Sequence, residues 1–186
     1  MLVLASESPR RKKLLKDLDI DFIAVSSQVV ENTQSIFPKH VPLLLAEQKA
    51  EAVAGLYPND FVLGADTIVS INGEIIGKPK DIEEARCILA KLSNKVNQVI
   101  TGVCLIKKNS FLRTSFIEVS NVYFKKLTQE TIDIYVNKVN TLDKAGAYAI
   151  QEFGDLIIDK IEGSFTNIMG LPCEKLTQTL NILDPL

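Results

Sequence analysis

Charged side chains interrupt apolar segments of this 186-residue chain, where they are costly unless an ion or a hydrogen-bonding partner compensates them. Asp66 follows the apolar run 61–65 and precedes a second β-rich run. Lys49 has apolar neighbours at helical spacing on both sides, and Arg11 shares a helical face with the leucines that follow it. A carboxylate and two cations in such places are typical of a site for an anionic ligand.

The first predicted helix begins with four cations, from Arg10 to Lys13, directly after Ser8-Pro9. The start of a helix already presents unpaired N–H groups and partial positive charge, so each added cation costs about 0.3–1 kcal/mol. A phosphate bound at this end would remove the conflict, since the N–H groups, the dipole and the Arg11 guanidinium would converge on it. The alternative is a solvated basic helix end. The chain has no Gly-x4-Gly-Lys-Ser/Thr pattern, so a P-loop is not indicated.

Each of the other charged candidates has a structural interpretation as well. Lys49 could extend from its apolar patch into solvent, and Asp66 could cap a turn. Glu31 lies in a polar stretch after a predicted strand, a pattern typical of an exposed residue. Lys78, in Gly77-Lys78-Pro79, is on a rigid turn that could direct its ammonium group or simply expose it.

Composition and charge exclude several classes of function. With 21 Lys and Arg against 23 Asp and Glu, the net charge of −2 gives no global positive field for a nucleic-acid polymer. The three cysteines are far apart, which predicts free thiols in a reducing cytoplasm and no zinc site. The single histidine, His40, argues against a Ser-His-Asp hydrolase. We expect a cytoplasmic protein without a membrane partner, because the sequence shows neither an export signal nor an apolar run of about 18 residues.

Strand and helix patterns alternate along the chain. Predicted strands cover residues 2–5, 21–26, 61–65, 67–71, 74–76, 98–107, 111–124 and 156–161. Predicted helices begin at Pro9 and cover residues 42–56, 81–92, 128–138 and 171–183. Asn72-Gly73 predicts a tight hairpin. The order predicts an α/β fold with a mixed sheet, and the length suits one domain or two lobes that share a core.

Six segments in this order resemble the Maf family of nucleoside triphosphate pyrophosphatases, nearly from end to end. They are Leu4-Ala5-Ser6-Glu7-Ser8-Pro9-Arg10-Arg11, Leu45-Ala46-Glu47-Gln48-Lys49-Ala50, Gly64-Ala65-Asp66-Thr67, Gly77-Lys78-Pro79, Asp143-Lys144-Ala145-Gly146-Ala147-Tyr148 and Gly170-Leu171-Pro172. The resemblance implies a single Maf-like domain over residues 1–186, with a twisted mixed sheet, flanking helices and two lobes around a central cleft. This fold is similar to that of inosine triphosphate pyrophosphatases.

The resemblance also implies roles for individual residues. Asp66 matches the catalytic aspartate of the family, and Glu31, Lys49 and Lys78 match its other charged active-site positions. Ser6, Arg10 and Arg11 match its phosphate-binding loop. A divalent cation, Mg²⁺ or Mn²⁺, is expected on Glu31 and Asp66, because hard cations prefer carboxylate and phosphate oxygens. A homodimer is an expectation at the level of the family.

Thr67 and Gln151 resemble the subgroup that acts on dTTP and UTP. The Gln151 amide has the acceptor and donors needed to pair with the O4 and N3–H edge of uracil or thymine. The implied reaction is hydrolysis of a nucleoside triphosphate to the monophosphate and pyrophosphate, with modified pyrimidine nucleotides as further substrates in a house-cleaning role. The alternatives are a pyrophosphatase for 7-methyl-GTP or for inosine and xanthosine triphosphates, and a nucleotide-binding regulator of septum formation without turnover.

Overall fold

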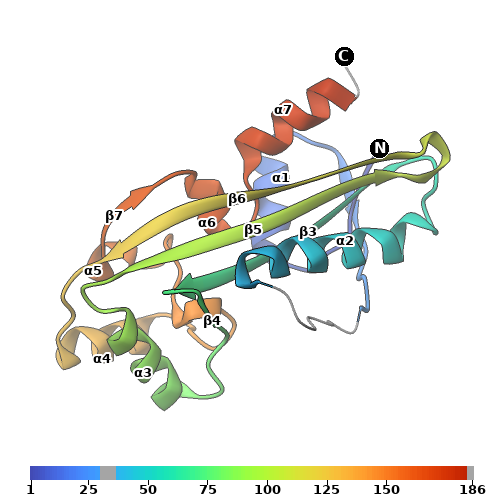
Figure 1. Ribbon diagram of the computed structural model, residues 1–186. Coiled ribbons are helices and arrows are strands. Elements are labelled where there is room, and N and C mark those ends of the chain that lie inside the picture. Colours follow the sequence, from blue (N-terminus) through green and yellow to red (C-terminus); the bar gives the residue numbers. More distant parts are fainter. Residues whose placement is uncertain (30–36, 184–186) are drawn as a thin grey trace. The chain divides into compact units, whose positions relative to one another are not determined.

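The computed structural model describes residues 1–29 and 37–183 and divides the chain into two compact units. Unit 1 contains Met1–Thr67, Thr101–Glu118 and Gly170–Leu186, and unit 2 contains Ile68–Ile100 and Val119–Met169. The three long strands in Figure 1 are β3 (Phe61–Ile71), β5 (Val96–Lys107) and β6 (Leu112–Phe124). Each of them has residues in both units. The chain therefore passes repeatedly from one unit to the other.

The strands form one mixed sheet, as the alternating pattern predicts. Its seven strands run in the order β2-β1-β3-β5-β6-β7, with β4 on β3. The four shorter strands are β1 (Leu2–Leu4), β2 (Phe22–Ala24), β4 (Glu74–Ile76) and β7 (Ile158–Glu162). Strand β1 pairs in parallel with both β2 and β3, whereas β3 with β4 and β6 with β7 are antiparallel. The Asn72-Gly73 hairpin is confirmed, and both residues have positive φ.

Helix starts follow the capping signals in the sequence. The longer helices are α1 (Pro9–Asp17), α2 (Val41–Ala54), α3 (Ile82–Leu92), α4 (Gln129–Lys138) and α7 (Cys173–Leu183). The Ser8, Asp81 and Thr128 side chains cap α1, α3 and α4 by accepting a backbone N–H three residues on. Short elements that the sequence did not predict are α5 (Gly154–Ile157), α6 (Phe165–Met169) and the 3-10 turns η1 (Pro38–His40), η2 (Lys108–Ser110) and η3 (Ala145–Ala147). They are too short for a periodic pattern.

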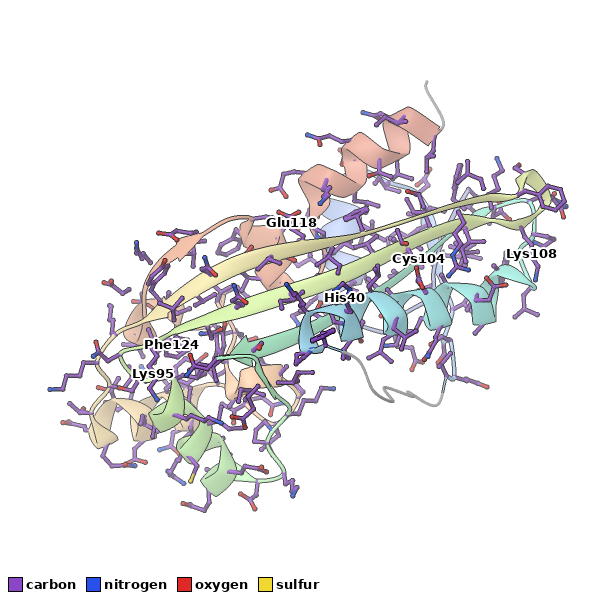
Figure 2. All side chains as sticks on the ribbon, in the orientation of Figure 1. His40, Lys95, Cys104, Lys108, Glu118 and Phe124 are labelled. Atoms are coloured by element: carbon purple, nitrogen blue, oxygen red, sulfur yellow. The ribbon has the colours of Figure 1, made fainter. Side chains whose placement is uncertain are left out.

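Within unit 1, α2 packs closely on the sheet through small residues. Ala46, Ala50 and Val53 of the helix are buried in one cluster with Cys104 of β5, which is labelled in Figure 2. A Cβ at Gly64 would lie 2.1 Å from the Ala46 carbonyl oxygen, and one at Gly102 would lie 2.3 Å from the Leu43 nitrogen. Only glycine permits this approach of helix and strands.

Within unit 2, α3 and α4 lie side by side (Figure 1) and cover a separate apolar cluster. Phe124 meets Tyr148 edge-on, with ring centroids 5.0 Å apart. The Tyr148 hydroxyl donates to Asn97 Oδ1 over 2.9 Å, so the buried polar tip is satisfied. This cluster fixes the chain around Tyr148.

One boundary prediction is wrong. Two strands were expected on either side of Asp66, but β3 is continuous, and both Asp66 and Thr67 lie inside it. The structural alternative for Asp66, capping a turn, is therefore wrong too. No helix within residues 1–29 and 37–183 has the length and apolar character to cross a membrane.

Candidate active site

Asp66 lies on β3 beyond the point where its parallel neighbour β1 ends. Strand β1 stops at Leu4, and the Ala5 N–H donates to the Leu63 oxygen over 2.8 Å. The Val25 N–H, just past β2, donates to the Leu4 oxygen over 2.9 Å. The carboxyl ends of β1 and β2 thus meet at one edge of the sheet, beside the part of β3 that bears Asp66. Ligands of open α/β sheets bind at such edges.

Asp66 forms an ion pair with Lys49 of α2. The Lys49 Nζ lies 2.6 Å from Asp66 Oδ1, and each side chain is only 14% exposed. The pair joins residues 17 positions apart in the sequence. A carboxylate and an ammonium group in a partly dry environment interact more strongly than they would at an exposed surface. The apolar patch around Lys49 therefore directs its ammonium group to the strand.

Gly64 explains how this ion pair is reached. Alternate residues of a strand share a face, so Gly64 and Asp66 both face α2. A Cβ at Gly64 would lie within 2.9 Å of Ala50 Cβ and even closer to the backbone of Ala46 and Ala50. Lys49 is in the same turn of the helix as these alanines. The missing side chain at Gly64 thus brings Lys49 to Asp66.

Arg11 is anchored by three acceptors, although it stands in the first turn of α1. Its Nε donates to the Gly170 carbonyl oxygen over 2.8 Å, and its Nη1 to Ser6 Oγ over 3.3 Å. Its Nη2 donates to Thr67 Oγ1 over 3.1 Å. Each nitrogen of the guanidinium therefore has a fixed acceptor. Arg11 is half-buried and is not a solvated helix end.

Thr67 connects Arg11 to the sheet. Its side chain points to the opposite face of β3 from Asp66, because successive strand residues alternate. The Thr67 hydroxyl lies 2.9 Å from the hydroxyl of Thr101 on β5 and 3.4 Å from the Gly170 oxygen. Unit 1 thus presents Lys49 and Asp66 on one face of β3, and Arg11 and Thr67 on the other, at the same edge.

The remaining predicted phosphate ligands are Ser6, in the loop between β1 and α1, and Arg10, in the first turn of α1. The Ser8 N–H donates to Ser6 Oγ over 3.2 Å, which turns the chain into the helix. Arg10 is half-buried next to Arg11. The first turn of α1 contains no acidic residue. A Ser hydroxyl, the positive end of a helix dipole and an anchored guanidinium are together the chemistry that binds phosphate.

Asp66 offers part of the donor set that Mg²⁺ or Mn²⁺ needs. Asp66 supplies carboxylate oxygen, the ligand type that hard cations prefer. Among the residues that the structure describes, no group of three or more His, Cys, Asp or Glu could hold a metal ion. A cation at Asp66 would therefore take most of its ligands from phosphate oxygens and water, as Mg²⁺ commonly does.

Comparison with known proteins decides the family. The family model described as "Maf-like protein" matches residues 1–183. The chain belongs to this family. A protein named dTTP/UTP pyrophosphatase from Acholeplasma laidlawii is 44% identical over 184 residues, which cover 97% of this chain and 95% of the relative. Another protein of that name, from Carboxydothermus hydrogenoformans, is 41% identical over 179 residues, covering 96% of each.

Solved structures support the fold of this Maf-like chain. The Ham1 protein of Staphylococcus aureus aligns with a TM-score of 0.56 at 20% identity and covers 98% of both chains. At that identity the similarity concerns the fold alone. It supports the predicted α/β fold with a mixed sheet and flanking helices.

Two residues predicted for the site belong to unit 2. Lys78 is exposed on the segment after β4, where the Gly146 N–H donates to the Gly77 oxygen over 3.0 Å. Gln151 is exposed in the turn that precedes α5. The segments around Gly77 and Gly146 are thus joined within unit 2. Glu31, the remaining predicted residue, lies outside the described residues.

The sequence did not predict the hydrogen bonds that Thr101, Gly170 and Lys144 form. Gly170 appears only as part of a motif, because no pattern shows that its carbonyl oxygen accepts from Arg11. Lys144 Nζ donates to the Asn140 oxygen over 2.5 Å and lies 2.8 Å from Asp143 Oδ1. A lysine inside a glycine-punctuated segment was the available signal, and it marks a structural contact here.

Proposed function

We propose that this protein is a nucleoside triphosphate pyrophosphatase that hydrolyses dTTP and UTP to the monophosphate and pyrophosphate. Relatives named for this activity match almost the whole chain at 41% and 44% identity. Within the structure, the observation that carries the proposal is the Lys49–Asp66 ion pair at the carboxyl edge of the parallel strands. It places a carboxylate at the same edge of the sheet as the Arg11 guanidinium.

In the proposed reaction, the oxygen of a water forms a bond to the α-phosphorus, and the bond from that phosphorus to the bridging oxygen breaks. Pyrophosphate leaves with the electron pair, and the water loses its proton. Asp66 either takes this proton as general base or holds the divalent cation. Lys49 orients the Asp66 carboxylate through the 2.6 Å contact. Negative charge that spreads over the triphosphate oxygens is stabilised by Arg11 and Lys78.

Glu31 would help to hold Mg²⁺ or Mn²⁺, and Asp66 would share this cation where it does not act as the general base. When bound, the cation would neutralise phosphate oxygens and acidify water. Ser6 and Arg10 add donors at the start of α1, where a phosphate group would bind. Gln151 selects the base in this proposal, because its amide matches the O4 and N3–H edge of uracil and thymine. A cytoplasmic location, a homodimer and a role in clearing modified pyrimidine nucleotides belong to the same proposal and rest on the family resemblance.

The first experiment measures pyrophosphate release from four substrates: dTTP, UTP, 7-methyl-GTP and ITP. Each is assayed with and without Mg²⁺. We expect kcat/KM to be highest for dTTP and UTP and to require the cation. Preference for ITP or 7-methyl-GTP would refute the pyrimidine assignment, whereas binding without release from any substrate would refute the enzymatic one.

The second experiment replaces Asp66 by Asn. We expect kcat to fall about 10²- to 10⁴-fold, because the amide neither takes a proton nor binds a hard cation as a carboxylate does. Asp133→Asn is the matched control, since Asp133 also pairs with a cation, Arg86 Nε, over 2.7 Å, but on the surface of unit 2. A thermal melt of both variants checks the fold. Unchanged release by Asp66→Asn would remove Asp66 from the mechanism.

A further inference from the structure

Thr101 is a buried hydroxyl directly behind the Arg11 anchor. It lies on β5 with 0% of its surface exposed, and its Oγ1 is 2.9 Å from Thr67 Oγ1. Thr67 in turn accepts from Arg11 Nη2 over 3.1 Å. A polar side chain is costly to bury, and this one is placed where it contacts a residue that holds Arg11.

The protons of these contacts can be assigned in part. A guanidinium only donates, so the Thr67 oxygen must be the acceptor from Arg11. Thr67 has a single hydroxyl proton, which it can direct to Thr101 or to the Gly170 oxygen, 3.4 Å away. When Thr101 donates to Thr67, that proton is available to Gly170. In either arrangement the Thr101 hydroxyl restricts the rotation of the Thr67 hydroxyl.

The Gly170 carbonyl completes this chain of contacts. It accepts from Arg11 Nε over 2.8 Å, so the guanidinium is held from two directions, by a backbone oxygen and by Thr67. Hydrogen bonds to a charged group that are arranged in a network strengthen one another. A loss at Thr101 would therefore weaken the hold on Arg11 without removing any group that could touch the substrate.

We propose that Thr101 is a positioning residue, which acts through Thr67 to hold the Arg11 guanidinium in the orientation that binds the triphosphate. This inference rests on the proposed role of Arg11 as a phosphate ligand. It adds to that role a buried residue with no contact to the ligand. Thr101→Val keeps the shape of the side chain and removes only the hydroxyl, so it tests the hydrogen bond directly.

The test measures the binding of inorganic tripolyphosphate by calorimetry at a fixed Mg²⁺ concentration. Thr101→Val should raise Kd about threefold to tenfold, the range expected for one hydrogen bond in a charged network. Thr101→Ser restores the hydroxyl and should bind as the wild type does. With dTTP, Thr101→Val should raise KM by a similar factor and change kcat less, because ground-state binding is lost.

Thr141→Val is the matched control. Thr141 is also 0% exposed, but its Oγ1 has no hydrogen-bond partner in the part of the chain that the structure describes. The same substitution there should leave Kd unchanged. A double-mutant cycle with Thr67→Val completes the test: the double variant should bind no more weakly than Thr67→Val alone, because both changes break the same path.

Each outcome separates this inference from the proposed function. If Thr101→Val binds tripolyphosphate like the wild type, or if Thr101→Ser is equally impaired, the positioning role is wrong even when dTTP is hydrolysed. Absence of tripolyphosphate binding in the wild type would overturn it as well. If the wild type binds tripolyphosphate, and Thr101→Val weakens this binding while Thr101→Ser and Thr141→Val do not, the positioning role holds even when no substrate is hydrolysed.

Discussion

Two lysines of this chain show how differently a cation can be held. Lys49, in unit 1, reaches from α2 to Asp66 on β3, and its side chain is 14% exposed. Lys144, in unit 2, is 5% exposed, and its partners are Asn140, Asp143 and Glu152, all within eight residues of it. The first contact joins a helix to a strand, whereas the second closes a loop on itself.

From this difference we expect a role in the reaction for Lys49 and a role in stability for Lys144. Lys144 donates to the Asn140 carbonyl oxygen and to Asp143, and it forms an ion pair with Glu152, so it satisfies polar groups of its own loop. Lys49 meets a carboxylate at the edge of the parallel strands, in a family whose named relatives hydrolyse nucleotides. The ion pair of Lys49 joins residues 17 positions apart, whereas the partners of Lys144 lie within eight residues of it.

The first prediction breaks the placement of Lys49. Gly64→Ala puts a Cβ against the Ala46 oxygen at 2.1 Å, so α2 must move away from β3. We expect a loss of about 3 kcal/mol in the free energy of unfolding, which lowers Tm by about 6–12 °C. Turnover should fall about 100-fold as Lys49 leaves Asp66.

Gly77→Ala, in unit 2, is the control for this substitution, because a Cβ there meets nothing within 4 Å in the described structure. Its Tm should stay within about 2 °C of the wild type. A Gly64→Ala variant with wild-type Tm and turnover would show that the close approach of α2 is not needed.

The second prediction compares the same substitution, Lys to Met, at Lys49 and at Lys144. Lys49→Met should lower turnover about 100-fold and Tm by less than about 4 °C, because Asp66 stands at an edge where water can replace the ammonium group. Lys144→Met should instead lower Tm by about 4–8 °C, since three loop acceptors lose their buried donor. Its kcat/KM at a temperature where it is folded should stay within about fivefold.

Thermal melts and pyrophosphate release on both variants decide between these roles. The same pattern in the two variants, either loss of stability alone or loss of turnover alone, would erase the distinction between a functional and a structural lysine.

The longer elements of both units could be predicted from the sequence, because capping residues and turn residues act locally. Ser8, Asp81 and Thr128 cap α1, α3 and α4 at or next to the predicted helix starts, and Asn72-Gly73 makes the predicted hairpin. The strand at Asp66 was harder to predict. A single carboxylate inside an apolar run suggests that the strand ends there, whereas β3 continues through it. Lys49 compensates the charge of the half-buried Asp66 carboxylate, and no local sequence pattern shows a partner 17 residues away.

The residues of the candidate site were predicted from their types and from the family resemblance, but their contacts were not. The spacing of Arg11 indicated a core-facing cation, but its acceptors, the Gly170 oxygen and the Thr67 hydroxyl, lie 159 and 56 residues away. A backbone carbonyl has no sequence signature at all. The sequence gives no sign of the role of Thr101 either, because threonine is common in strands for its β propensity alone.

The third prediction compares buried acidic groups of the two units at high pH. Burial raises the pKa of the Cys104 thiol in unit 1 from 9.0 to about 11, and Glu47 and Glu51 add to the shift while Arg113 opposes it. In unit 2, burial raises the pKa of Tyr135 from 10.0 to about 12, and that of Tyr148 also rises above its ordinary value. All three groups are neutral in the folded protein up to a higher pH than in the unfolded chain.

A raised folded pKa means that the unfolded chain loses its proton first, so stability falls as pH rises between the two values. Cys104 should destabilise the protein from about pH 9 to 11, and the tyrosines only above about pH 10. Melts from pH 8 to 11 should therefore show Tm of the wild type falling by a few degrees from pH 9. In Cys104→Ala the decline should begin nearer pH 10, after correction for its lower Tm at pH 8. If Tm falls with pH in the same way in both proteins, the pKa of the Cys104 thiol is not raised in the folded state. Cys104 then makes no contribution to the loss of stability at high pH.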